Sequence, residues 1–96
     1  MNKEIIVQYL STKKNEFEEK FGVTKIGLFG SYARGENYRD SDIDIVVEMK
    51  KPDLLILVGI KQKIEGDLGV KVDIVRNRIR MNRTLKKRIE RDVVYA

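Results

Sequence analysis

The sequence contains no cysteine and no histidine. Without cysteine, neither a disulfide framework nor a thiolate metal site can hold the fold together, and a reducing cytoplasm is the expected compartment. Without histidine, imidazole takes no part in catalysis or in metal binding. A metal ion bound by this chain would have to take oxygen ligands, which favour a hard cation such as Mg²⁺.

Long hydrophobic runs are absent as well. No apolar stretch approaches the roughly 20 residues that cross a bilayer. The start of the chain, MNKEIIVQYL, lacks the apolar core and the small-residue cleavage site of a secretory signal. We therefore expect a cytoplasmic protein that does not enter a membrane. With 96 residues, the chain has room for one small domain, residues 1–96, with a single core.

Positive charge is in modest excess. The 20 lysines and arginines outnumber the 15 aspartates and glutamates, which gives a net charge of +5. This excess suits an anionic ligand or partner, and it permits direct nucleic-acid binding without requiring it. In the basic last part of the chain, lysine and arginine alternate with Glu90 and Asp92, which favours a solvated helix face over a nucleic-acid surface.

The hydrophobic pattern predicts alternating helices and strands. Apolar residues spaced three and four apart predict an amphipathic helix over residues 3–20, which Gly22 ends. Further helices are expected over residues 32–34, where Ser31 caps the first turn, over residues 52–66 and from about residue 80 onward. Strands are expected over residues 24–29, 42–48 and 70–75. This order predicts an α+β (α/β two-layer) fold, in which a small mixed β-sheet is flanked by helices.

Three aspartates stand at alternating positions on two predicted strands. In an extended chain, residues two apart point the same way and lie roughly 6.6 Å apart, so Asp42 and Asp44 project from one face while the intervening isoleucine faces the core. Two anions on one face repel each other, and a cation held between them best explains the pattern. Asp73 lies opposite the aliphatic side chains of the third strand, so three carboxylates converge if the two strands are neighbours. Taken alone, Asp73 could instead pair with Lys71 or Arg76.

The turn at Gly30-Ser31 supplies a complementary set of donors. A glycine lets the backbone come close to a phosphate, and the free amides at the start of a helix, together with a serine hydroxyl, are aimed at an anion. Arg34 on the same short helix could clamp a phosphate oxygen, or it could be solvated or paired with Glu36. Gly30, Ser31 and Arg34 are therefore the candidate nucleotide-binding residues. Nearby aromatic residues are as compatible with packing as with a nucleobase contact: Phe29, Tyr32 and Tyr38.

Gly30-Ser31, ten further residues and then Asp42-x-Asp44 resemble the signature of the DNA polymerase beta nucleotidyltransferase superfamily. The surrounding segment, LFGSYARGENYRDSDIDIVVE, is similar to its smallest members, the stand-alone minimal nucleotidyltransferases or MNT proteins. At ordinary residue usage, the four fixed residues arise by chance about once in 10⁵ start positions. The resemblance covers residues 26–75, and the ending RIERDVVYA is also similar.

The resemblance implies a polymerase-beta-like nucleotidyltransferase fold and a nucleoside triphosphate, with ATP as the donor, held by Gly30 and Ser31. It also implies that Asp42, Asp44 and Asp73 hold two Mg²⁺ ions while an acceptor attacks the alpha phosphorus. We hypothesise that Asp44 and Asp73 share the ion that activates the nucleophile, with Asp73 as the candidate general base. Asp42 and Asp44 would then bind the ion that carries the triphosphate.

MNT proteins are commonly encoded beside a HEPN-domain partner in prokaryotic toxin–antitoxin pairs. The resemblance therefore implies an antitoxin that transfers AMP from ATP to a tyrosine hydroxyl of a HEPN toxin. Two other functions stay open: a non-catalytic antitoxin that neutralises the toxin by covering it, and transfer to a small molecule or a nucleic-acid end. Relatives with the last function carry additional acceptor-binding domains, for which 96 residues leave no room. The intact carboxylates and Gly-Ser pair favour catalysis over simple binding.

Overall fold

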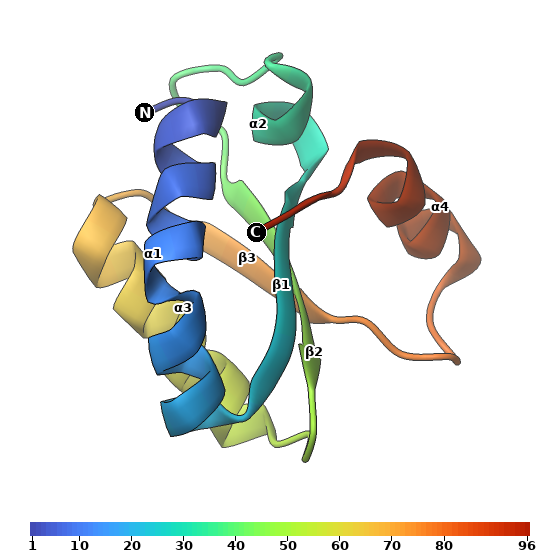
Figure 1. Ribbon diagram of the computed structural model, residues 1–96. Coiled ribbons are helices and arrows are strands. Elements are labelled where there is room, and N and C mark those ends of the chain that lie inside the picture. Colours follow the sequence, from blue (N-terminus) through green and yellow to red (C-terminus); the bar gives the residue numbers. More distant parts are fainter.

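The computed structural model describes all 96 residues and contains four helices and four strands (Figure 1). The strands pair in the order β3-β2-β1-β4. β1 is antiparallel to β2 and β4, whereas β2 and β3 are parallel, which confirms the predicted mixed sheet flanked by helices. The helices are α1 (Lys3–Phe21), α2 (Gly30–Arg34), α3 (Leu54–Leu68) and α4 (Arg83–Asp92). The strands are β1 (Val23–Phe29), β2 (Ile43–Met49), β3 (Val72–Arg76) and β4 (Val94–Tyr95).

Short polar residues and glycines fix the ends of the long helices. The Asn2 side chain accepts a hydrogen bond from the Ile5 N–H at 2.9 Å, which starts α1. Gly22 ends this helix with a φ of 70°, in the left-handed region that glycine adopts most easily. The Asp53 side chain caps α3 in the same way as Asn2 caps α1, with a bond of 2.8 Å from the Leu55 N–H. These caps explain why the predicted long helices begin close to the observed ones.

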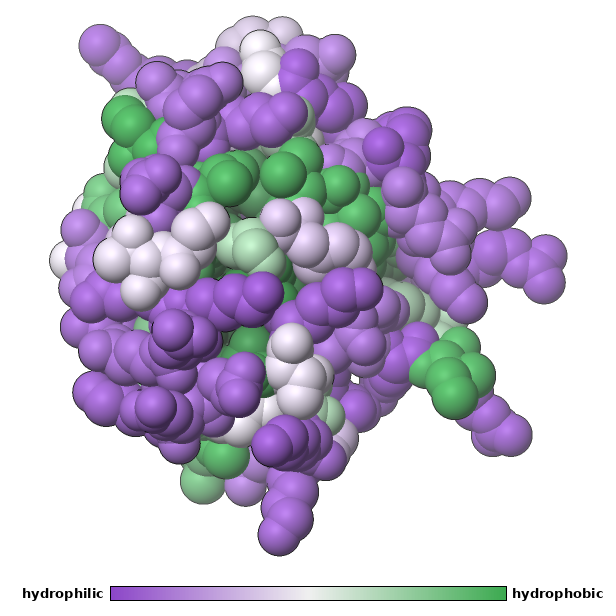
Figure 2. All heavy atoms as spheres, in the orientation of Figure 1, coloured by the Kyte–Doolittle hydropathy of each residue, from purple (hydrophilic) through white to green (hydrophobic).

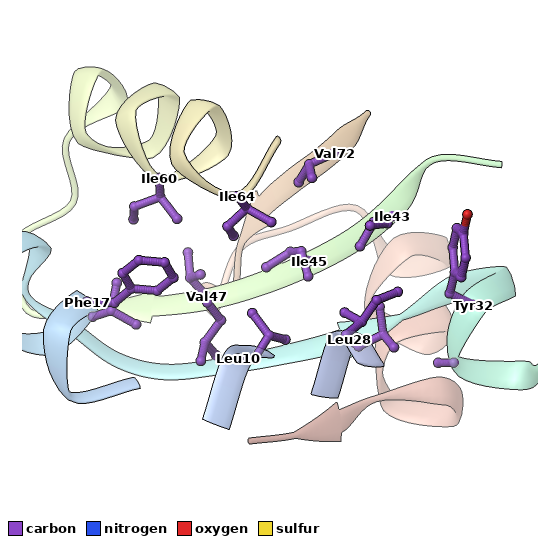
Figure 3. Packing of buried hydrophobic residues seen from close by; sticks show 14 residues of the cluster. Leu10, Phe17, Leu28, Tyr32, Ile43, Ile45, Val47, Ile60, Ile64 and Val72 are labelled. Atoms are coloured by element: carbon purple, nitrogen blue, oxygen red, sulfur yellow. The ribbon is translucent and has the colours of Figure 1, made fainter. Parts of the chain in front are cut away.

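The main core lies between the sheet and the pair α1 and α3. Alternate residues of β2, namely Ile43, Ile45 and Val47, are fully buried in it. Figure 3 shows these side chains on the side of the sheet that faces Ile60 and Ile64 of α3. Full burial of one such side chain contributes about 1.5–3 kcal/mol, so this face supplies most of the hydrophobic stabilisation.

The opposite face of the sheet has a smaller core under α4. Phe29 of β1 and Val46 of β2 point to this side and pack with Ile89 of α4. In Figure 1, α4 lies on the far side of the sheet from α1 and α3. The basic helix at the end of the chain therefore covers the face on which strand alternation places the aspartates of β2 and β3.

β4, near the end of the chain, is not among the strands expected from the sequence. Val93, which the helix predicted from about residue 80 onward would include, lies one residue beyond the end of α4. β4 follows it and pairs with β1 through Leu28 and Gly27. A Cβ at position 27 would lie 2.9 Å from the side chains of both Tyr95 and Val93. The missing side chain of Gly27 therefore provides the space in which β4 packs.

A methyl group at position 27 should loosen β4. We expect Gly27→Ala to lower the free energy of unfolding by about 1–3 kcal/mol, because the new Cβ overlaps two side chains. Gly66→Ala is the matched control, since an added Cβ there meets no atom within 4 Å inside α3. Alanine at that helical position should raise the free energy of unfolding by about 0.5–1 kcal/mol. Urea denaturation measures both effects, and wild-type stability of Gly27→Ala would contradict this account of β4.

Apolar side chains also reach the surface. Figure 2 shows a mostly hydrophilic face with a hydrophobic band between α1 and α4, where β4 and the end of the chain lie. Large apolar side chains are exposed at the start of α3 and in the loop before α4, at Leu54, Leu55 and Ile79. Such patches leave room for a partner surface. None of the helices combines the length and the apolar character that crossing a bilayer requires.

Candidate active site

The three predicted carboxylates lie at one end of the sheet, where β2 and β3 begin and β1 ends. Asp44 of β2 is paired in register with Phe29 of β1 on one side and with Asp73 of β3 on the other. Asp42 lies just before β2 and is exposed. Strand alternation places Asp44 and Asp73 on the face that α4 covers, opposite to the main core. Because β2 and β3 are paired neighbours, the condition that the sequence set for the three carboxylates to converge is met.

The surroundings of Asp44 oppose its ionisation. Its carboxyl is half-buried, and the loss of solvation is the largest of the causes that raise its pKa above the ordinary value of 3.8. The charges of Asp73 and Asp42 raise this pKa further, while the guanidinium groups of Arg88 and Arg34 partly offset them. None of the ion pairs of the chain involves these aspartates. Neighbouring carboxylates without a cationic partner stabilise a cation that binds between them.

The donor set suits Mg²⁺, although the chain alone does not form a complete metal centre. Mg²⁺ commonly takes one or two protein carboxylates and completes its six ligands with water and phosphate oxygens. Asp44 and Asp73 carry such oxygens on adjacent strands. No three acidic side chains of the chain form a group that could hold a metal ion. The three-ligand set that includes Asp42 therefore stays a prediction, and oxygens of a bound nucleotide would have to complete the coordination.

The position of Asp44 requires glycine at position 30. The φ of Gly30 is 76°, in the left-handed region that favours glycine. A Cβ at this position would lie 2.8 Å from Cγ of Asp44. The turn from β1 into α2 thus lies directly against the central carboxylate. The predicted phosphate contact of Gly30 needs the same close backbone approach, and it stays a prediction.

Ser31 does not cap the short helix, contrary to the prediction. The turn at Gly30 starts α2 directly after β1, so Ser31 already lies within the first helical turn. The N-cap residue is Phe29, and no side chain caps the helix. Ser31 is half-buried beside Gly30, and its contact with a phosphate stays a prediction.

Arg34 joins α2 to α4. Its guanidinium donates to Asp92 at 2.6 Å and to Glu36 at 3.0 Å, so the pairing with Glu36 that the sequence left open is present. Asp92 is buried at the end of α4 and also accepts hydrogen bonds from Arg91. We refer to the Arg34–Asp92 pair as the α2–α4 latch. The guanidinium of Arg34 thus already has two carboxylate partners. Its contact with a phosphate stays a prediction.

Two residues of α4 that bear on this site were not among the predicted site residues. Asp92 forms the α2–α4 latch, and Arg88 lies near enough to Asp44 for its charge to lower the pKa of that carboxyl. Asp92 stands three residues after Ile89, a spacing that puts an acidic residue on the buried side of a basic helix and could have revealed it. Arg88 carries no comparable signal, because basic residues surround it in the sequence.

The loop before β2 borders a hollow that touches only Asp42 among the candidate site residues. A solvent-open hollow of about 430 Å³ lies beside Asp42 and includes Arg39 in its lining. Tyr38 in the same loop is 82% exposed, whereas Phe29 and Tyr32 are buried and serve packing. Of the aromatic residues considered as nucleobase contacts, Tyr38 is therefore the accessible one.

Comparison with known sequences agrees with this arrangement. A family model described as a nucleotidyltransferase domain matches residues 10–95, a span that contains the Gly30 turn and the aspartates. The chain belongs to the nucleotidyltransferase domain family. Among curated relatives, this nucleotidyltransferase is 41% identical over 94 residues to the protein adenylyltransferase MntA of Thermococcus cleftensis. That match covers 97% of this chain and 94% of the relative.

Solved structures share the fold of this nucleotidyltransferase. A protein provisionally named a minimal nucleotidyltransferase superposes with a TM-score of 0.78 at 32% identity, and the alignment covers 98% of this chain and 95% of that one. A toxin–antitoxin structure with AMP-PNP superposes with a TM-score of 0.71 at 27% identity. That alignment covers 99% of this chain and 72% of the other. The predicted nucleotidyltransferase fold is confirmed.

Proposed function

We propose that this nucleotidyltransferase transfers AMP from Mg²⁺-bound ATP to a hydroxyl of a partner protein. The observation that carries the proposal is the strand register, which sets Asp44 between the Gly30 turn and Asp73. This arrangement brings the Gly30 turn, to which we assign phosphate binding, close to two adjacent carboxylates, to which we assign cation binding. The likeness to a protein adenylyltransferase and to a structure with AMP-PNP supports ATP as the donor and a protein as the acceptor.

The transfer exchanges a phosphoanhydride bond for a phosphodiester bond. The acceptor hydroxyl oxygen attacks the alpha phosphorus, the bond from that phosphorus to the bridging oxygen breaks, and pyrophosphate leaves. Asp73 is exposed beside Asp44, so we assign to it the role of general base, which accepts the proton of the attacking hydroxyl. Gly30 and Ser31 would hold the phosphates, and the three aspartates, Asp42 included, would hold two Mg²⁺ ions. When bound, Mg²⁺ supplies charge neutralisation at the attacking and leaving oxygens.

We infer that the partner is a HEPN-domain toxin and that the chain is its antitoxin, acting in the cytoplasm. The support is the MNT signature around Gly30 and Asp44, together with the likeness to a chain of a toxin–antitoxin structure. On this proposal, residues 1–96 act as a single transferase domain and the acceptor hydroxyl lies on the partner. The exposed apolar side chains at the start of α3 are available for such a contact.

Label transfer from alpha-labelled ATP to the co-expressed neighbouring protein tests the proposal. With Mg²⁺, the wild-type chain should label the partner, and Asp42→Ala and Asp73→Ala should each reduce labelling by about 100-fold or more. Glu19→Gln, an exposed charge change on α1, should label at the wild-type rate. If no version of the chain labels the partner while all of them bind and neutralise it, the chain is a binding antitoxin and the transfer proposal is wrong.

A further inference from the structure

Arg88 of α4 lies beside the candidate site, and neither the fold nor the function proposed above gives it a role. Its neighbour Ile89 is buried against β1 and β2 and anchors α4 to the sheet. Asp92, four residues after Arg88, binds Arg34 of α2 at 2.6 Å. Residues four apart lie on one face of a helix. Arg88 therefore lies one turn before Asp92, on the side of α4 that faces α2.

Arg88 is close to the carboxylates without pairing with them. Its charge acts on Asp44, the half-buried carboxylate at the centre of the site. The Arg88 side chain is nevertheless exposed and forms no ion pair. Its basic neighbours are placed differently, because Arg91 is bound to Asp92 and Lys86 lines a hollow at the other end of the sheet. Arg88 is thus an unpaired guanidinium of α4 whose charge reaches Asp44.

A guanidinium beside carboxylates that hold Mg²⁺ is unfavourable unless an anion comes between the two cations. Like charges at short range repel each other, and both cations are attracted to the same carboxylates. A triphosphate removes the conflict, since its oxygens can bind the metal ion on one side and accept hydrogen bonds from the guanidinium on the other. The planar fork of arginine matches two phosphate oxygens, which a lysine ammonium does not.

We propose that Arg88 binds phosphate oxygens of the nucleoside triphosphate held over Asp44 and Asp73. This inference rests on the proposed function, because it takes a nucleoside triphosphate as the ligand of the site. It also gives the α2–α4 latch a purpose, since the bond between Arg34 and Asp92 holds α4 in the position that presents Arg88 to the site.

Calorimetric titration of the purified chain with Mg-ATP tests the role of Arg88. Arg88→Gln should weaken binding by about 10-fold or more, the loss expected for a charge-assisted hydrogen bond. Arg88→Lys keeps the charge without the fork and should recover part of the affinity. Lys87→Gln is the matched control, because it removes the same charge from a residue roughly 100° around the helix. Its affinity for Mg-ATP should stay close to that of the wild type.

Titration with Mn²⁺ alone separates a binding role from damage to the site. Because Arg88→Gln loses a positive charge beside Asp44, it should bind Mn²⁺ as tightly as the wild type or more tightly. If the substitution instead disturbs the site, Arg88→Gln would bind both Mn²⁺ and Mg-ATP more weakly, and this result would overturn the inference. Wild-type affinity of Arg88→Gln for Mg-ATP, or an equal loss in Lys87→Gln, would also overturn it and leave the proposed function intact. A wild-type chain that binds no ATP would overturn the proposed function and this inference together.

Discussion

Replacing Asp44 with asparagine is expected to reduce AMP transfer by about 1,000-fold or more, because the variant removes the carboxylate at the centre of the site. The fold should survive, since asparagine has nearly the same shape and Asp44 forms no ion pair in the chain. Label-transfer rates at saturating ATP and partner measure the effect. Glu19→Gln, which removes one exposed negative charge from α1, should transfer at the wild-type rate.

The same substitution should make the chain more stable at neutral pH. Burial and the charges of Asp73 and Asp42 raise the pKa of Asp44 above 3.8, so its ionised form disfavours the folded state. This penalty is absent below the unfolded pKa, where the carboxyl is protonated in both states, and it develops as the pH rises through the folded pKa. Asp44→Asn should therefore exceed the wild type in free energy of unfolding at pH 7 and match it below about pH 4. Loss of both activity and stability would instead assign Asp44 to the fold.

Replacing Asp92 with asparagine is expected to destabilise the fold. The variant keeps the shape of the side chain but removes the charge that accepts hydrogen bonds from Arg34 and Arg91. The Asp92 side chain is only 2% exposed, so water cannot replace these partners. We expect the free energy of unfolding to fall by about 2 kcal/mol, which lowers the Tm of a domain of this size by about 10 °C. Thermal denaturation followed by circular dichroism measures the shift.

Glu36→Gln is the control for Asp92→Asn, because both carboxylates bind Arg34. The Glu36 side chain is 67% exposed, so its loss should change the free energy of unfolding by less than about 0.5 kcal/mol.

Hydrogen bonds from Arg91 and then from Arg34 hold the pKa of Asp92 below its ordinary value. Such a carboxylate stabilises the fold above its unfolded pKa and loses this contribution as the pH falls through the folded pKa. The free energy of unfolding of the wild type should therefore approach that of Asp92→Asn below about pH 4. Equal losses of this free energy in Asp92→Asn and Glu36→Gln at pH 7 would contradict the latch.

The sequence predicts the parts of the site that lie along one strand or one turn. The alternation of Asp42 and Asp44 with isoleucines follows from the period of an extended chain, and the structure places Asp44 on the face opposite to the main core. The turn at Gly30 is also predicted locally, from the Gly-Ser pair between an expected strand and an expected short helix. The pairing of Asp44 with Asp73 needed one further condition, that β2 and β3 are neighbours, and the structure supplies it.

The parts that the sequence does not predict depend on how α4 packs across the sheet. Arg34 and Asp92 are 58 residues apart, and no local pattern links them. The same packing brings Arg88 near enough for its charge to act on Asp44. β4 was missed because Val93 continues the helical spacing of the residues before it, whereas pairing with β1 prevails where Gly27 leaves space. Tertiary contacts of this kind override a local periodicity.

The intact mass of the partner protein tests the central claim most directly. The partner is expressed together with the wild-type chain or with Asp44→Asn, purified and measured by mass spectrometry. The account predicts a partner that carries one or more AMP groups beside the wild type and none beside Asp44→Asn. A partner of unmodified mass beside the wild type, recovered in a complex that still forms, would contradict nucleotidyl transfer as the function of this site.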